Sequence, residues 1–203
     1  MAHMSSNDRV AGPPTEGWLD LTPEQRQMLV DVAASAIRHE IERGRPPAVD
    51  PRDYPEPLRV EAATFVTLER EGRLVGCIGT LEPRESLVES VASNACAAAF
   101  RDPRDLGPRP RTTDGLDIHI SILSPMEPMQ FDSEEDLLRQ IRPGVDGLLL
   151  EDGFHRGTFL PSVWDQLPDP SDFLAHLKMK AGLPPGYWSS SIRVFRYTAQ
   201  SVP

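Results

Sequence analysis

The order of secondary-structure signals repeats along the chain, and this repetition constrains the fold more than any other feature. In the first half, residues 60–69 and 73–81 have the composition of strands and are joined through Glu71-Gly72, a hairpin signal. Ser86 and Glu89 form a capping box, and the helical pattern that begins at Leu87 ends before Pro103. Residues 116–123 then alternate between apolar and polar, as expected for a strand with one polar face.

The second half has the same order of signals. Strands are predicted at 147–151 and 154–160, on either side of Asp152-Gly153. A helix is predicted from Ser171 to Ala181, and a last strand covers 191–199. A small helix at 133–141 separates the two halves. Both halves are therefore predicted to be strand–strand–helix–strand units.

The second strands of the two halves also match locally. The segment Gly79-Thr80-Leu81-Glu82-Pro83 resembles Gly157-Thr158-Phe159-Leu160-Pro161, which favours internal duplication over chance. Because hairpins imply antiparallel pairing, we expect an α+β fold in which the repeats form one mixed, mostly antiparallel sheet covered by helices.

A further helix is predicted ahead of the repeats. Thr22 is its expected N-cap, Pro23 its first residue, Gln25 completes a capping box, and Gly44 ends it. Residues 1–20 are polar and are interpreted as a mobile tail, in which 1–3 are an expression remnant. The remainder, 21–203, is expected to be a single domain, and the proline-rich stretch after Gly44 is interpreted as a rigid connector rather than a functional loop.

Composition excludes several classes of protein. The 203 residues contain no apolar run near the ~20 residues that cross a membrane. The net charge of −10 argues against a general nucleic-acid binder, because phosphate contacts need a basic surface. Two cysteines are too few for a disulfide scaffold, so a cytoplasmic setting with reduced thiols is expected.

Several spaced segments resemble the AMMECR-type family, whose prokaryotic members are called AmmeMemoRadiSam system protein A. The resemblance covers 21–199 and rests on motifs in the family's order: Phe65-Val66-Thr67-Leu68, Leu74-Val75-Gly76-Cys77-Ile78-Gly79-Thr80, Asp102-Pro103-Arg104, Gly144-Val145-Asp146-Gly147-Leu148, Arg156-Gly157-Thr158-Phe159-Leu160-Pro161, and Lys180-Ala181-Gly182-Leu183-Pro184 with Trp188. The resemblance implies a duplicated α+β domain. It also implies partners, since prokaryotic members occur beside, or fused to, a Memo-type protein and a radical S-adenosylmethionine protein. It implies no established molecular activity.

Cys77 is the candidate catalytic residue. Gly76 and Gly79 flank the Cys77-Ile78 pair, and glycine within a strand often marks the close approach of a ligand or of another backbone. A thiol there could act as a nucleophile or a soft metal ligand if a nearby cation activated it. Alternatively, Cys77 packs as a small core residue and the glycines let a helix lie on the sheet. Cys96, within an alanine-rich helix face, is interpreted as structural.

The sequence offers weak candidates for a base and for an anion site. His155 lies on the second strand of the other repeat, and His119 lies on the polar side of its strand; for both, an ordinary surface or hydrogen-bonded histidine is the favoured interpretation. The arginines of one loop could bind an anion, although a solvated loop is favoured for them: Arg101, Arg104, Arg109 and Arg111. No zinc-type spacing and no phosphate-binding glycine loop is present.

Lys180 is one of only two lysines among 21 basic residues, and it lies within a family-matching segment. One interpretation is a site that needs an ammonium rather than a guanidinium group. The alternative is that two lysines among 21 basic residues arise by chance. One hypothesis is a small-molecule enzyme or enzyme component centred on Cys77. The other is a non-catalytic binding or adaptor module for a Memo-type or radical S-adenosylmethionine partner. The candidate binding residues are Gly76, Gly79, Thr80, Arg156, Thr158 and Lys180. Substrate, cofactor, reaction type and oligomeric state are not predicted by the sequence.

Overall fold

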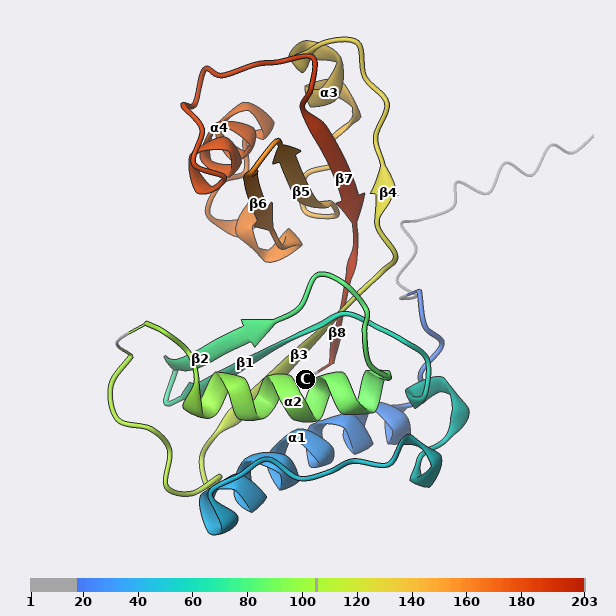
Figure 1. Ribbon diagram of the computed structural model, residues 1–203, viewed down its shortest axis with the longest axis vertical. Helices are drawn as coiled ribbons and strands as arrows, with labels where there is room; N and C mark the ends of the chain where they lie inside the picture. Colours follow the sequence, from blue (N-terminus) through green and yellow to red (C-terminus); the bar gives the residue numbers. More distant parts are fainter. Residues whose placement is uncertain (1–17, 105, 203) are drawn as a thin grey trace, which may run out of the picture.

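The computed structural model describes residues 18–104 and 106–202, which form two lobes with one β-sheet each (Figure 1). The strand order is β2-β1-β3-β8 in the first sheet and β4-β7-β5-β6 in the second. The strands of the first sheet are β1 (Thr64–Arg70), β2 (Arg73–Gly79), β3 (Asp117–Leu123) and β8 (Ala199–Val202). Those of the second are β4 (Glu127–Pro128), β5 (Gly147–Asp152), β6 (His155–Phe159) and β7 (Arg193–Tyr197). The predicted α+β class is confirmed.

The prediction of one mixed sheet is wrong. The described strands form two separate sheets, and every strand pair in them is antiparallel. One physical reason is that the outer edge of β2 is occupied: the Cys77 N–H and C=O are bonded to Asp102 and Arg104. A strand of the second half therefore cannot pair with β2 at Cys77.

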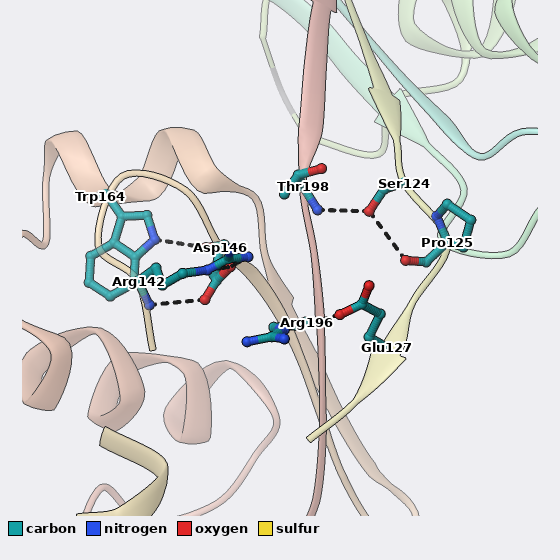
Figure 2. Close-up of polar contacts among 8 residues, drawn as sticks. All are labelled: Ser124, Pro125, Glu127, Arg142, Asp146, Trp164, Arg196 and Thr198. Carbon is teal, nitrogen blue, oxygen red and sulfur yellow. Dashed lines mark hydrogen bonds and ion pairs between the residues drawn. The ribbon is translucent and has the colours of Figure 1, made fainter. Parts of the chain in front are cut away.

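The duplicated order of elements is present within the two sheets. The first half has β2-β1-β3 with helix α2 (Leu87–Phe100), and the second has β6-β5-β7 with helix α4 (Pro170–Lys180). The fourth strands are exchanged: β4 follows β3 but pairs with β7, and β8 follows β7 but pairs with β3. The two segments that cross between the lobes meet at Ser124 and Thr198, where the Thr198 N–H donates to Ser124 Oγ (Figure 2). Each lobe is therefore completed by a strand from the opposite half of the chain.

The structure corrects the local match between the two halves. Counted from the hairpin turns, Gly157 opposite Leu150 corresponds to Gly76 opposite Leu68, and not to Gly79. A bulge between Leu68 and Glu69 adds one residue to the first hairpin. The match at Gly79 is three residues out of register, so the bulge does not account for it and the shared Gly-Thr pair there is a coincidence of sequence.

In the first lobe, two helices cover one face of the sheet (Figure 1). These are α1 (Pro23–Arg43) and α2, and the predicted capping boxes at Thr22/Gln25 and Ser86/Glu89 are confirmed. Alternate residues of the strands face the helices and form the core with them, among them Val66, Leu68, Ile118, Ile120 and Ile122. Among residues 18–104 and 106–202, no helix covers the opposite face of this sheet.

In the second lobe, α3 (Glu134–Gln140) and α4 pack against Leu148, Leu150 and Val194. The short 3-10 helix η3 (Pro161–Asp165) brings Trp164 into stacking contact with Phe173. A third apolar cluster joins the two lobes, with residues from both: Ala63, Leu123 and Tyr197, flanked by Phe65, Leu81, Met126, Leu160 and Ala199.

The remaining segments lie near the first lobe. The predicted tail falls outside the described residues up to position 17, but its last part is anchored, because Leu19 exchanges two hydrogen bonds with Gln200. The proline-rich connector contains two short 3-10 helices, η1 (Pro51–Asp53) and η2 (Glu56–Leu58). Across the described part of the chain, none of the helices combines the length and the apolar character that a membrane crossing requires.

Candidate functional site

Cys77 lies on the helix-free face of the first sheet, near the middle of edge strand β2. Its cross-strand partner is Thr67 of β1, whose hydroxyl donates a hydrogen bond of 3.1 Å to the Cys77 sulfur. Since alternate residues of a strand face opposite sides, the neighbouring Ile78 packs toward the helices while the half-exposed Cys77 thiol faces away from them. The thiol is therefore not part of the helix-covered core.

The backbone of Cys77 is bonded on its outer side by an aspartate–arginine pair. The Cys77 N–H donates to Asp102 Oδ2 at 2.9 Å, and Arg104 Nη2 donates to the Cys77 carbonyl at 3.2 Å. Arg104 also donates to both carboxylate oxygens of Asp102, which is only 5% exposed. The pKa of Asp102 is held well below its usual range. The largest cause is the hydrogen bond from the Arg104 side chain, and hydrogen bonds from the backbone N–H groups of Cys77 and Arg104 lower the pKa further. This pair occupies the place of a further strand and holds the Cys77 main chain.

Lys180 reaches the same place from the second lobe. It is the last residue of α4, and its Nζ lies 5.0 Å from the centre of the Phe159 ring. Desolvation lowers the pKa of Lys180, and the Arg104 guanidinium adds to this effect while Cys77 opposes it. Lys180, Arg104 and the Cys77 thiol are thus close enough to act on one another electrostatically, although they come from different lobes.

His119 lies on the same open face but one strand further away. Thr67 pairs with Cys77 on one side and with His119 of β3 on the other. Two strand spacings of ~4.8 Å separate Cys77 from His119, which is too far for a direct hydrogen bond. The open face therefore carries a polar row, Cys77–Thr67–His119, in which the histidine does not contact the sulfur.

The second sheet provides an internal comparison for this row. Its equivalent positions are Thr158, Leu149 and Phe195. Thr158 hydrogen-bonds the Leu148 carbonyl and the Tyr197 hydroxyl, and Leu149 is buried. The equivalent row thus serves packing, and the thiol with its cations occurs in only one of the two repeats.

The structure places the two candidate glycines in packing roles. A Cβ on Gly76 would lie 1.9 Å from the Ala98 carbonyl oxygen of α2, so this glycine allows the helix to approach the sheet. A Cβ on Gly79 would lie 2.3 Å from the Phe65 ring. At both glycines, the group that approaches closely is therefore another part of the protein and not a ligand.

The other candidate residues lie beside the site rather than in it. Arg156 forms ion pairs with Glu82 and Glu151, each at 3.1 Å, and thereby links the two lobes. Thr80 is exposed, and its N–H donates to the Thr64 carbonyl. His155 is hydrogen-bonded through Nδ1 to the Ala181 carbonyl. Of these predicted binding residues, Lys180 is the one with an electrostatic effect from Cys77.

Cys96 is fully buried in the first core, where burial raises the pKa of its thiol to about 12. Its structural interpretation agrees with this position. Within residues 18–104 and 106–202, there is no cluster of three or more histidine, cysteine, aspartate or glutamate side chains that could hold a metal ion.

The set of predicted site residues missed Thr67 and Asp102, and Arg104 entered only as a member of an arginine-rich loop. Two signals could have found them. Thr67 alternates with Val66 and Leu68, which places it on the open face, and Asp102-Pro103-Arg104 directly follows the helix that packs behind Cys77.

The fold and site define a class of protein: a duplicated α+β protein with exchanged strands and one thiol–cation cluster. The chain belongs to the AMMECR1 family, whose model matches residues 30–202.

Relatives and a solved structure support this assignment. A protein of Methanothermobacter thermautotrophicus is 39% identical over 185 residues, covering 90% of this chain and 96% of that protein. Protein MJ0810 of Methanocaldococcus jannaschii is 37% identical over 155 residues, covering 72% of this chain and 75% of that protein. The crystal structure of the uncharacterized protein PH0010 from Pyrococcus horikoshii superposes with a TM-score of 0.80 at 34% identity, covering 89% of this chain and 92% of that one. These similarities assign the chain to the family and give no evidence about its activity.

Proposed function

We propose that the chain is an enzyme, or a component of one, that acts on a small molecule through the Cys77 thiol. The observation that carries this proposal is the half-exposed sulfur, which accepts a hydrogen bond from Thr67 while Arg104 is hydrogen-bonded to the carbonyl of the same cysteine. Positive charge near a cysteine favours the thiolate, which is the nucleophilic form. Asp102 and Arg104 hold the strand that presents the thiol, so they act as positioning residues.

A binding screen tests this proposal. Purified full-length protein is incubated with metabolite mixtures before and after alkylation with iodoacetamide, and bound compounds are identified by mass spectrometry. We expect a small-molecule ligand that the native protein binds and the alkylated protein does not. The Cys77→Ser variant treated with the same reagent is the control, because any effect there comes from modification elsewhere. Equal binding to native and alkylated protein would refute a site centred on Cys77.

A second candidate function is a non-catalytic adaptor module, and one observation favours it. Phe154 is fully exposed at the tip of the β5–β6 hairpin, and Met179 of α4 is 45% exposed next to Lys180. Exposed large apolar side chains are contacts that a partner protein can bury. In this alternative, the partner is the Memo-type or radical S-adenosylmethionine protein that the family resemblance implies, and the setting is the cytoplasm.

The two functions predict different effects of Phe154→Ser. As an adaptor, the variant loses co-purification with a Memo-type partner and keeps the alkylation rate of Cys77. As an enzyme acting alone, it keeps ligand binding in the metabolite screen. Loss of partner binding with no ligand found in that screen favours the adaptor.

A further inference from the structure

We infer that the Thr67 hydroxyl is a further catalytic group, which donates its hydrogen bond to the Cys77 sulfur and stabilises the thiolate. The inference rests on the proposed function of Cys77 and adds the residue that keeps its sulfur in the reactive form. Asp102 and Arg104 bond the main chain of Cys77, whereas the Thr67 hydroxyl contacts the reacting atom itself, at 3.1 Å. Thr67 therefore acts on the sulfur directly, and the other two residues act by holding its strand.

The register of β1 and β2 brings the two side chains together. The N–H and C=O of Cys77 point away from β1, since they are bonded to Asp102 and Arg104 on the outer edge of β2. Thr67 and Cys77 are thus a cross-strand pair without mutual backbone hydrogen bonds, the kind of pair in which side chains lie closest. Because the β-branched side chain of Thr67 has few χ1 rotamers, the backbone largely sets the contact.

The single proton of the Thr67 hydroxyl is directed at the sulfur. Among the described residues, the Cys77 Sγ is the acceptor to which this hydroxyl donates. A neutral thiol is a weak acceptor, and a hydrogen bond to an ionised group is roughly twice as strong as one between neutral groups. Because the bond strengthens when the sulfur loses its proton, it favours the thiolate over the thiol.

The second sheet indicates that the fold does not require a hydroxyl at this position. There Leu149 takes the place of Thr67, and Thr158 takes the place of Cys77. The Leu149 side chain is buried and has no donor to offer. The hydroxyl therefore accompanies the thiol and is not a demand of the strand pairing.

The pH dependence of Cys77 alkylation in Thr67→Val tests the role of the hydroxyl. The full chain reacts with iodoacetamide between about pH 6 and about pH 10. The thiolate forms the C–S bond as iodide leaves, and mass spectrometry of the Cys77 peptide gives the rate. We expect Thr67→Val to react roughly two- to fivefold more slowly than wild type at pH 7, because less of its thiol is ionised. At the high-pH plateau it should react as fast as wild type or faster, because a thiolate without the hydrogen bond is the stronger nucleophile.

This difference between neutral pH and the plateau separates the inferred role from a structural one. A change in the packing or exposure of Cys77 would alter the rate by the same factor at every pH. The charged and titratable side chains around the sulfur are the same in both proteins, so their effects cancel in the ratio of the two rates. They are Arg104 after α2, Lys180 of α4 and His119 of β3.

Two further variants serve as controls. Thr67→Ser keeps the hydroxyl and should restore most of the wild-type rate at pH 7. Ser121→Ala removes a hydroxyl from the same open face, one that is not the donor to the sulfur, and should leave the profile unchanged.

Profiles of Thr67→Val and wild type that superpose, or that differ by a constant factor, overturn the inference while the proposed function stands. A native wild-type protein whose Cys77 does not react at any pH refutes the proposed function itself. Should Thr67→Val fail to fold, Thr67→Ala is measured in its place with the same expected result, since both variants lack the hydroxyl.

Discussion

Ser124 and Thr198 exchange two hydrogen bonds at the point where the chain crosses between the sheets in both directions. The Thr198 N–H donates to Ser124 Oγ at 2.9 Å (Figure 2). The Ser124 N–H donates to the Thr198 carbonyl, also at 2.9 Å. Since β4 and β8 begin just beyond these residues, the pair connects the exchanged strands of the two lobes.

Ser124→Ala removes the acceptor of the Thr198 N–H and is expected to lower the free energy of unfolding by about 1–2 kcal/mol. Thr198→Ala is the matched control, because none of the described residues is hydrogen-bonded to its hydroxyl. Thr198→Ala should lower the free energy of unfolding by clearly less than Ser124→Ala does. Denaturant unfolding of both variants measures the difference, and equal losses would show that the crossing bond contributes little.

Gly76→Ala tests the close approach of α2 to the strand that carries Cys77. Its Cβ would meet the Ala98 carbonyl oxygen at 1.9 Å, so the helix must move. We expect a loss of roughly 1–3 kcal/mol or more. Gly186→Ala has no atom within 4 Å of the added Cβ and should melt like wild type. A Gly76→Ala variant as stable as this control would contradict the packing role of Gly76.

Asp102→Asn should show a pH-dependent loss of stability. Because the folded-state pKa of Asp102 lies below its unfolded value of about 3.9, its carboxylate stabilises the fold above about pH 4 and loses that contribution as the pH falls further. The variant should be less stable than wild type by about 1–2 kcal/mol at pH 7, an amount limited by the exposure of Arg104. Thermal melts between pH 7 and pH 2.5 should show the two proteins converging; a constant difference would mean that the carboxylate charge is unimportant.

Local signals predicted much of the fold. The capping boxes at Thr22 and Ser86 and the hairpin turn at Glu71-Gly72 each depend on neighbouring residues, and all three are present. The second hairpin is also present, but its turn is Gly153-Phe154, one residue later than predicted. The strand exchange was not predicted, because it depends on pairing between residues as distant as Leu123 and Ala199. The local match between the two halves was three residues out of register, because the Gly-Thr pairs at Gly79 and Gly157 do not lie at equivalent positions of the two hairpins.

The site was predicted only in part, for a similar reason. Cys77 and Lys180 were each singled out by their chemistry, but their proximity arises from the packing of one lobe on the other. Arg104 was obscured by its arginine-rich surroundings, since nothing in the sequence distinguishes it from exposed Arg109 and Arg111.

The central claim is that Cys77 is a reactive thiol on an open sheet face and not a core residue. Its most direct test is the rate of alkylation of Cys77 by iodoacetamide in the native protein at pH 7, measured together with the melting temperature of Cys77→Ser. The account predicts reaction faster than that of a free thiol and a serine variant that melts within error of wild type. Slow alkylation until unfolding, with a Cys77→Ser variant destabilised by roughly 1–3 kcal/mol because its hydroxyl is buried without a partner, would contradict it.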